Sequence, residues 1–438
     1  MTSLPDLAGP PVSGSPRHPD TGPRPLAAVG AATGLLTAYE PGDHWFFASP
    51  TRTLLAHGAS VEVPQDERPP AVRVSELLAE RRSAGERAAL VVGTVPFDRA
   101  SPAVLAVPHT VSWAPALRED PLIALPAPPV ASPAGGWTVR EVPTAREYGE
   151  SVAEAVLRMR GGELSKVVLA RTLELTSAGE PDIAAILRRL AGSDPGGYTF
   201  AMPSGPGRTL LGASPELLVS RRGPRLVANP LAGSAPRSAD LAEDVRTAAA
   251  LLESAKDLHE HAVVVDAVRT ALAPYCASID VPARPTLVRT ATMWHLSTTV
   301  TGEVSDPAVS ALELACALHP TPAVCGTPTP YAREVIGELE PFDRGHYTGM
   351  AGWSDANGDG EWVVSIRCAE ARGRLLRLYA GAGVVPGSTP EGETAETAAK
   401  FRTFLDAVGA GDAVGSGDAA GAGTDAARAG ADATGAGQ

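Results

Sequence analysis

The sequence predicts an α+β fold in which large, mostly antiparallel β-sheets pack together and are flanked by helices. The chain has 438 residues, of which 44% are hydrophobic, so it can bury a large core. Apolar strand-like runs are interleaved with helical patterns, but not in the one-for-one alternation that a doubly wound parallel sheet requires. We expect strands at the apolar runs 45–47, 89–95, 167–173, 209–219, 363–367 and 374–380.

The two ends of the chain differ from the rest in composition. Residues 1–26 contain seven prolines and no aromatic residue, and residues 409–438 are almost wholly Gly, Ala, Asp, Ser and Thr. Neither segment can bury enough apolar surface to offset the entropy of ordering it, so both are expected to be disordered tails. Between them we expect an N-terminal part of the fold at 27–140 and a core region at 141–408.

Charge, hydropathy and cysteine usage exclude several classes of protein. The formal net charge of −13 argues against a nucleic-acid partner, because phosphate binding needs a basic surface. No apolar run approaches the ~20 residues that span a bilayer, and the N-terminus lacks the charged and apolar regions of a signal peptide, so we expect no membrane partner and a cytoplasmic protein. The four cysteines form no CxxC pair and are expected to be core residues rather than disulfides or zinc ligands.

A helix followed by a strand is expected around residue 160. Apolar residues recur at helical spacing at Tyr148, Val152, Val156 and Met159. Gly161 and Gly162 then end the helix, and Lys166 begins a strand on which it shares one face with Val168. A second helix is expected as a single element over 241–272.

Lys166 is one of only three lysines in a chain that carries 34 arginines. A position that needs only positive charge accepts either residue, whereas a buried ammonium can lose its proton near neutral pH and a guanidinium cannot. The lysine at 166 therefore suggests a base. A charged gatekeeper on an edge strand is the alternative interpretation.

Four stretches place ionisable residues among small or apolar ones: 164–171, 212–219 with 229–237, 255–266, and 379–400. Glu260 and Glu396, each on an expected helix, offer oxygen ligands for Mg²⁺, which commonly takes one or two protein carboxylates. Lys166 as base and Glu216 as acid would need pKa shifts of opposite sign, each toward ~7, which burial supplies. The alternatives are an exposed i, i+4 ion pair between Lys256 and Glu260 and a turn role for Glu216.

Other motifs carry less information. In "HEH" at 259–261 the two histidines lie on different faces of a helix and cannot bind one ion together. "DANGDGEW" at 355–362 begins like a calcium loop, but Ile366 replaces the twelfth-position glutamate, so we expect a turn between strands. "GAGVVPG" at 381–387 lacks the third glycine of a dinucleotide loop, and no lysine follows a glycine as in a Walker A loop.

Taken jointly and in this order, these stretches resemble the chorismate-utilising enzymes, and among them the isochorismate synthases. The resemblance covers residues 145–408 and extends more weakly through 42–58 and 91–98. It implies a single large fold in which 27–140 is a variable region and 141–408 is the chorismate-binding catalytic core.

The resemblance implies a Mg²⁺-dependent conversion of chorismate to isochorismate, in which water attacks ring carbon C2, the double bonds shift and the C4 hydroxyl leaves. Lys166 would activate the water and Glu216 would protonate the hydroxyl, while Glu260 and Glu396 would hold Mg²⁺. The implied substrate-binding residues are Arg367 and Lys400 at the carboxylates, backbone amides near Gly233, Gly381 and Gly383, Ala323 and Tyr347 on the pocket wall, and His295 near the ring.

Within the family, Lys166 replaces the glutamine of the relatives that add ammonia, and Ala232 replaces the lysine of those that make aminodeoxychorismate. A salicylate synthase, which eliminates pyruvate from isochorismate, remains an alternative, although "HPTPAVCG" at 319–326 and "GEWVVSIRCAE" at 360–370 look like the isochorismate-only enzymes. A chorismate-binding relative without turnover is a third interpretation.

Two residues depart from the family pattern. Thr394 stands where an aromatic residue often precedes the metal-binding glutamate, and Leu258 replaces the arginine of "KDRHEH". Family precedent favours a monomer that hands its product to an isochorismatase. The sequence leaves open whether the product feeds a siderophore through 2,3-dihydroxybenzoate, salicylate or menaquinone.

Overall fold

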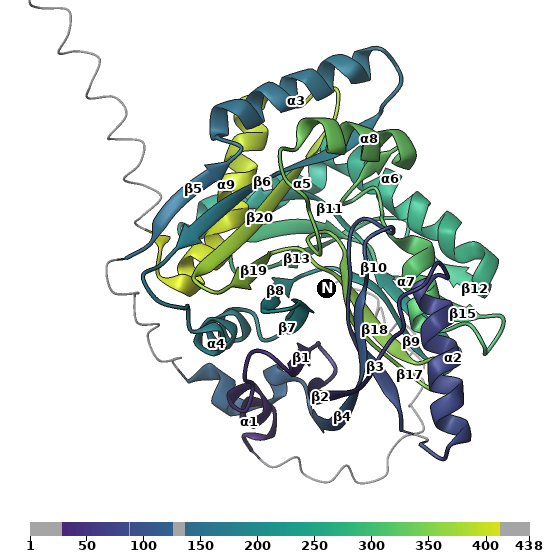
Figure 1. Ribbon diagram of the computed structural model, residues 1–438. Coiled ribbons are helices and arrows are strands. Elements are labelled where there is room, and N and C mark those ends of the chain that lie inside the picture. Colours follow the sequence, from purple (N-terminus) through teal and green to yellow (C-terminus); the bar gives the residue numbers. More distant parts are fainter. Residues whose placement is uncertain (1–28, 87, 126–135, 412–438) are drawn as a thin grey trace, which may run out of the picture.

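The computed structural model describes residues 29–86, 88–125 and 136–411. The expected tail at 1–26, and nearly all of the one at 409–438, lie outside these residues. Figure 1 shows strands gathered into a large curled sheet with the helices on its outside, as the α+β prediction requires. The fold class predicted from the sequence is confirmed.

In the described residues, 17 strands form one hydrogen-bonded sheet whose pairings are antiparallel. The strands follow the pairing order β5 (Thr138–Val142), β6 (Lys166–Thr176), β20 (Leu375–Val384), β19 (Cys368–Arg372), β8 (Arg208–Ser214), β7 (Tyr198–Gly205), β1 (His44–Ala48), β2 (Thr53–Glu62), β4 (Val104–Ala114), β3 (Leu90–Val95), β17 (Met350–Asp355), β18 (Gly360–Val364), β9 (Leu217–Arg222), β10 (Arg225–Asn229), β15 (Val300–Val304) and β12 (Cys276–Asp280). The short strand β16 (Gly326–Thr327) pairs with the start of β6, on the edge that β5 occupies further along. A separate three-stranded sheet has the order β11 (Leu231–Pro236), β14 (Met293–Ser297) and β13 (Thr286–Arg289).

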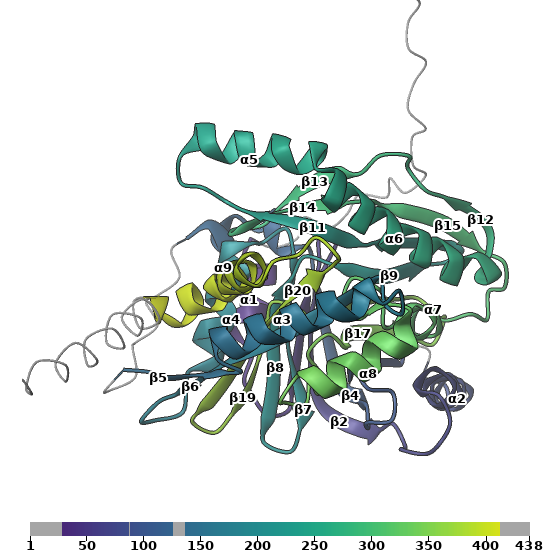
Figure 2. The ribbon, with the colours of Figure 1, turned by 90° about the horizontal axis from the view of Figure 1, so that it is seen from above.

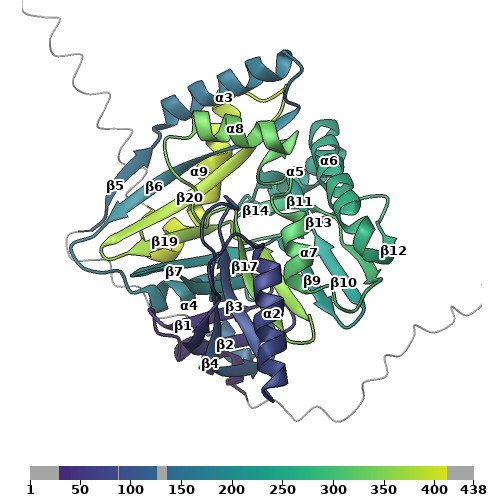
Figure 3. The ribbon, with the colours of Figure 1, turned by 45° about the vertical axis from the view of Figure 1, so that its right-hand side comes forward.

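The helices cover several parts of this framework. The described helices are α1 (Ala31–Thr37), α2 (Pro70–Ser83), α3 (Ala145–Arg160), α4 (Ile183–Ser193), α5 (Leu241–Glu253), α6 (Ala255–Leu272), α7 (Ala311–Leu318), α8 (Thr329–Leu339) and α9 (Pro390–Val408). Helices α3, α8 and α9 pack on β6 and β20, and α5 and α6 lie on the small sheet, as Figure 2 shows. Helices α2 and α7 lie side by side on the opposite flank (Figure 3).

The helix and strand expected around residue 160 are present. Helix α3 begins with a capping box in which Thr144 and Glu147 satisfy each other's backbone N–H groups, and it ends at Gly161. Its apolar face, including Tyr148 and Val152, is buried against β6. The strand β6 then begins at Lys166, as predicted.

Three expected elements have other boundaries than the sequence suggested. The single helix expected over 241–272 is wrong, because the chain breaks at Ser254, whose side chain accepts a hydrogen bond from the Asp257 N–H and so starts a second helix. The strand expected over 209–219 is two strands separated at Pro215, which has no N–H to donate to a ladder. The strand expected at 363–367 ends at Val364, and Arg367 lies in the left-handed region at φ 47°.

The turn expected at 355–362 is confirmed, since it joins β17 to β18. The four cysteines lie in the described part of the chain and are free thiols, two of them buried and two partly buried. Within the described residues, no helix has both the length and the apolar character needed to cross a membrane.

Candidate active site

One cleft, which encloses about 800 Å³ including its open mouth, lies between β6 and β20 of the large sheet, β11 and β14 of the small one, and helices α6 and α9. The sequence-predicted residues that line it are Glu216, Gly233, Glu260, His295, Ala323, Tyr347, Arg367, Gly381, Gly383, Glu396 and Lys400. Lys166, the remaining predicted residue, reaches the cleft through its ion pair with Glu260. Residues spread over more than 230 sequence positions therefore meet in one place.

Lys166 is the first residue of β6, and its side chain is only 3% exposed. Its Nζ lies 2.9 Å from Oε1 of Glu260. The edge-strand gatekeeper interpretation is wrong, because β6 is paired along one edge with β20 and at residue 166 along the other edge with β16. Lys166 and Glu260 therefore form a largely buried ion pair at the cleft.

Glu216 lies in the two-residue connection between β8 and β9, which forms no turn, and its side chain lines the cleft and is buried. Burial raises its pKa to about 7, and the Leu231 N–H together with the positive charges of Lys166, Arg367 and Lys400 offsets part of that rise. A carboxyl group with this pKa holds a proton for much of the time near neutral pH and is suited to donate it.

Helix α6 presents Lys256, Asp257 and Glu260 to the cleft. The expected i, i+4 pair between Lys256 and Glu260 is not formed: the Nζ of Lys256 lies 3.5 Å from Oε1 of Glu393 on α9, and Glu260 binds Lys166 instead. His261 lies on another face of the helix, where its Nε2 is 2.7 Å from the hydroxyl of Thr298 and burial lowers its pKa to about 4.

Helix α9 contributes Glu396 and Lys400, one turn apart. The Nζ of Lys400 is 2.6 Å from Oε1 of Glu396 and also donates to the carbonyl of Gly381 at 2.9 Å, while the Ser234 hydroxyl donates to the same Glu396 oxygen at 3.1 Å. Burial alone would raise the pKa of Glu396, but Lys400 and Ser234 outweigh it and the pKa is lowered. Glu396 therefore remains an anionic oxygen ligand.

Arg367 and His295 meet on the opposite wall, with Nη2 of Arg367 3.2 Å from Nε2 of His295. Burial, followed by the charges of Arg367 and Lys400, holds the pKa of His295 well below its usual range, so the imidazole is neutral and its Nε2 can accept from the guanidinium. Burial lowers the pKa of Arg367 to about 10, which leaves it charged at neutral pH. Arg367 therefore gives this wall a positive charge to which an anionic ligand can bind.

Glycines allow the backbone to come close to these charged groups. A Cβ on Gly383 would lie 2.6 Å from Oε1 of Glu260, and one on Gly381 would lie 2.7 Å from the hydroxyl of Tyr347. Gly233 has φ 75°, which favours glycine. Any side chain at 383 would displace the carboxylate that holds Lys166.

Two carboxylates that the sequence did not single out lie near Glu260 and Glu396: Asp257 lines the cleft, and the buried Glu393 contacts Lys256. Burial raises the pKa of Asp257 and of Glu393, and the negative charge of Glu396 raises both further. Both residues stand three positions before a predicted metal ligand, so an i, i+3 helical spacing was the signal that could have found them. Carboxylate oxygens are the ligands that hard divalent cations prefer.

A buried ion pair between Glu340 and Arg344 stabilises one wall of the cleft. Glu340 accepts from the Ala170 N–H at 2.8 Å and binds Arg344 through both oxygens. Arg344 donates to the carbonyls of Val168 at 2.7 Å and Val324 at 2.8 Å. Val168 and Ala170 lie on the edge of β6 between the residues that pair with β16 and those that pair with β5. The side chains of Glu340 and Arg344 therefore form hydrogen bonds there that a neighbouring strand would otherwise form. Val168 and Val324 line the cleft.

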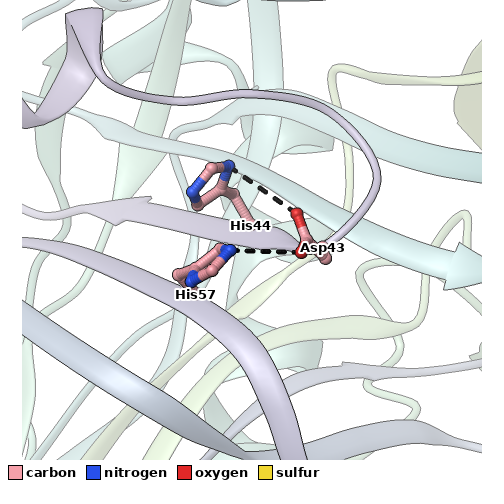
Figure 4. Close-up of side chains that lie close together, drawn as sticks. All are labelled: Asp43, His44 and His57. Carbon is pink, nitrogen blue, oxygen red and sulfur yellow. Dashed lines mark ion pairs between the residues drawn. The ribbon is translucent and has the colours of Figure 1, made fainter.

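A second cluster of ionisable residues lies away from the cleft, at the β1–β2 hairpin, where Asp43, His44 and His57 come together (Figure 4). The Nε2 of His57 is 3.1 Å from Oδ2 of Asp43, and Nδ1 of His44 is 4.0 Å from Oδ1. The same Nδ1 lies 2.9 Å from the carbonyl oxygen of Glu40 and 3.1 Å from its N–H nitrogen. Because the backbone of Glu40 already hydrogen-bonds to that nitrogen, we interpret the cluster as one that stabilises the hairpin rather than as a metal site.

Comparison with known proteins gives consistent matches. Residues 124–409 match the family described as "Chorismate binding enzyme". The chain is 53% identical to the isochorismate synthase DhbC of Bacillus subtilis over 86% of this chain and 96% of that protein, and 43% identical to the vibriobactin-specific isochorismate synthase of Vibrio cholerae over 83% and 91%. The crystal structure of DhbC from Bacillus anthracis superposes with a TM-score of 0.81 at 48% identity, covering 86% of this chain and all of that one.

Proposed function

The chain belongs to the family of chorismate-binding enzymes and, within it, to the isochorismate synthases; on that premise we propose how its cleft converts chorismate to isochorismate. One observation carries the proposal. Lys166 and Glu216, which share one buried cleft, have the residue types of a base and an acid, and the pKa of Glu216 is raised to about 7. The reaction is an isomerisation in which a hydroxyl group is moved around the ring.

In the proposed reaction, uncharged Lys166 takes a proton from a water molecule as the water oxygen bonds to C2. The ring double bonds shift, the C4–O bond breaks, and Glu216 gives its proton to the departing hydroxyl, which leaves as water. The proton gained by Lys166 then returns to Glu216 through solvent, so one water enters and one leaves. The Nζ of Lys166 lies 2.9 Å from Oε1 of Glu260, so the proposed base and a proposed metal ligand are in direct contact.

The substrate is a dianion, and the chain carries a net charge of −13, so binding depends on local cations. Arg367 and Lys400 are proposed to bind its carboxylates, with backbone N–H groups near Gly233, Gly381 and Gly383 closing around them. Ala323 and Tyr347 would form the apolar and aromatic wall, and neutral His295 would hold Arg367 in place near the ring.

Glu260 and Glu396 are residues of the type that binds Mg²⁺, since Mg²⁺ takes oxygen ligands and the lowered pKa of Glu396 keeps that carboxylate anionic. We propose that Glu260 and Glu396 hold it. When bound, Mg²⁺ would supply positive charge that attracts the anionic substrate and balances the glutamates.

The experiment that tests this function is identification of the product by NMR after incubation of the purified protein with chorismate and Mg²⁺, without ammonia or glutamine. We expect isochorismate in equilibrium with chorismate. Salicylate with pyruvate would instead establish the salicylate synthase alternative, and chorismate that remains unchanged at saturating Mg²⁺ would indicate binding without turnover.

We further propose that the product feeds 2,3-dihydroxybenzoate synthesis for a siderophore. The identity to DhbC of Bacillus subtilis is 53% over 86% of this chain, against 36% over 60% for MenF of the same organism, which supports this route over menaquinone. Loss of catechol secretion in a deletion strain grown without iron would support it, and loss of menaquinone instead would overturn it.

The working context is proposed as a cytoplasmic monomer that hands isochorismate to an isochorismatase. Four free cysteines suit a reducing compartment. Light scattering on the eluate of a gel-filtration column tests the oligomeric state, and a dimer mass would contradict the proposal.

A further inference from the structure

The three lysines of the chain all lie at the cleft, and the other 34 of its 37 lysine and arginine residues are arginines. Each lysine contacts a different glutamate: Lys166 binds Glu260 at 2.9 Å, Lys400 binds Glu396 at 2.6 Å, and Lys256 binds Glu393 at 3.5 Å. In a chain so biased toward arginine, retention of lysine marks a position where the chemistry differs between the two residues. The proposed function uses Lys166 and Lys400, and leaves Lys256 without a role.

Lys256 lies in the first turn of α6, and its partner Glu393 lies in the first turn of α9. The side chain of Lys256 is 47% exposed, compared with 3% for Lys166 and 15% for Lys400, whereas Glu393 is only 4% exposed. Lys256 is therefore the lysine of the cleft that solvent reaches most freely. Its contact joins the two helices that carry Glu260 and Glu396.

Four carboxylates near Lys256 make this exposed charge important. Asp257, Glu260, Glu393 and Glu396 all act on Lys256, and although partial burial lowers its pKa, the attraction of Glu393 and then of Glu260 outweighs burial and raises the pKa. Lys256 therefore stays charged at neutral pH. An anionic ligand approaching this acidic protein meets repulsion from these groups unless a cation offsets it.

The contact between Lys256 and Glu393 also suits release. An ammonium group is a compact point charge with rotatable donors, and at 3.5 Å it makes one loose contact with one carboxylate oxygen. A guanidinium in its place would bind both oxygens as a fork and hold α6 to α9 more firmly. A position that must exchange partners during each turnover favours the lysine.

We propose that Lys256 is the entrance cation of the cleft: it draws the dianionic substrate past the carboxylates of α6 and α9, and its releasable contact with Glu393 holds the two helices together between turnovers. This inference rests on the proposed conversion of chorismate, because it names how that substrate reaches the site. It adds a binding residue to those that the sequence pointed to.

The test compares Lys256→Gln with a matched control on the same helix. Arg269 is 54% exposed, pairs with Asp266 and lies outside the cleft, so Arg269→Gln also removes one positive charge from α6. For Lys256→Gln we expect kcat/KM for chorismate to fall about ten-fold at low ionic strength, with kcat within about two-fold of the unmodified enzyme and the deficit shrinking as salt is added. The control variant should keep its kcat/KM at every salt concentration.

Lys256→Arg separates the charge from the releasable contact. We expect it to keep KM near that of the unmodified enzyme while kcat falls, because a forked pair with Glu393 slows exchange at the mouth. A second readout is the calorimetric Kd for chorismate in EDTA, which we expect to weaken about ten-fold in Lys256→Gln and not in Arg269→Gln.

The outcomes distinguish this inference from the proposed function. If the unmodified protein forms no isochorismate, the proposed function is wrong. If it does, but Lys256→Gln matches Arg269→Gln in kcat/KM, salt dependence and chorismate affinity, the entrance role is overturned. An unaltered kcat in Lys256→Arg would show that turnover does not need release of the contact with Glu393, and only the electrostatic part of the inference would stand.

Discussion

At the scale of single residues, Lys166 and Arg367 of the cleft are suited to different tasks. Lys166 is buried against Glu260, where either cation would form an ion pair, and of the two residues only lysine can also act as a base. Arg367, on the opposite wall, stays charged and is suited to binding alone.

Lys166→Arg is therefore expected to keep the fold and the pairing with Glu260 but to lose hydration, with turnover at least ~100-fold below that of the unmodified enzyme. Turnover is measured from the NMR signal of isochorismate, and folding from the thermal midpoint. Near-normal turnover in this variant would remove Lys166 from the role of base.

Glu216→Gln tests the buried acid through stability as well as activity. The folded pKa of Glu216 is about 7, above the ordinary 4.5, so its stabilising effect is fully present below pH ~4.5 and is lost as the pH rises toward 7. Glutamine does not titrate. We therefore expect the variant to lose turnover yet gain stability relative to the unmodified protein as pH rises from 5 to 7.5, by about 2 kcal/mol.

The measurement is urea unfolding at both pH values in EDTA. Parallel stability profiles would show that the pKa of Glu216 is ordinary in solution. A catalytic group that costs stability is expected at a site selected for activity.

Glu260→Gln tests the metal assignment. We expect activity to fall and the Mg²⁺ concentration for half-maximal rate to rise about ten-fold or more, because one anionic oxygen ligand is lost. Glu338, which is 59% exposed and pairs with Arg158, supplies a control in Glu338→Gln. A metal dependence equal to that of the control would place the ligand elsewhere.

Sequence reasoning reached most of the cleft because its residues sit in short motifs with unusual polarity. It could not find Lys256 by spacing, since the i, i+4 pattern suggested Glu260 as partner and the true partner, Glu393, is 137 positions away. The scarcity of lysine was the available signal. The roles assigned to the individual residues remain predictions, as does the division at residue 140.

At the scale of elements, strand β6 is supported along its edge partly by strands and partly by side chains. Glu340 and Arg344, with side chains 2% and 3% exposed, satisfy the backbone of Val168 and Ala170 where β5 and β16 do not reach. The sequence could not reveal this arrangement, because it depends on where two neighbouring strands end.

Arg344→Lys should therefore shift the walls that carry Val168 and Val324, and we expect kcat/KM to fall about ten-fold or more together with a loss of a few kcal/mol of stability. Arg221 is a matched control, since it is 3% exposed and donates to the carbonyls of Gly223, Val309 and Pro307 away from the cleft. Arg221→Lys should lose comparable stability and keep kcat/KM. Equal kinetic losses in both variants would show that general destabilisation is responsible.

Element boundaries were predicted less well than element types. The run 241–272 has helical periodicity throughout, and the break at Ser254 depends on one hydroxyl group that caps the second helix. That break sets where α6 begins, and therefore places Lys256, Asp257 and Glu260 at the cleft.

At the scale of the whole molecule, the N-terminal strands are built into the sheet. Strand β1 pairs with β7, and β3 pairs with β17, so residues before 140 are bonded on both sides to residues after it. The two regions therefore share hydrogen bonds as well as apolar clusters.

Scanning calorimetry is expected to show one unfolding transition, with the calorimetric and van't Hoff enthalpies in agreement, because separating the regions would break the sheet. Two resolved transitions would contradict this expectation and would indicate that 27–140 can unfold alone.

The gathering of all three lysines at one cleft has a practical consequence for labelling. A reagent or protease specific for lysine has, apart from the α-amino group, no targets on this chain beyond that cleft. Lys256, half-exposed at the mouth, is the side chain that such a reagent would meet first. An ordinary amine-reactive reagent would thus modify the lysines of this protein only at its cleft, and bound substrate should protect them.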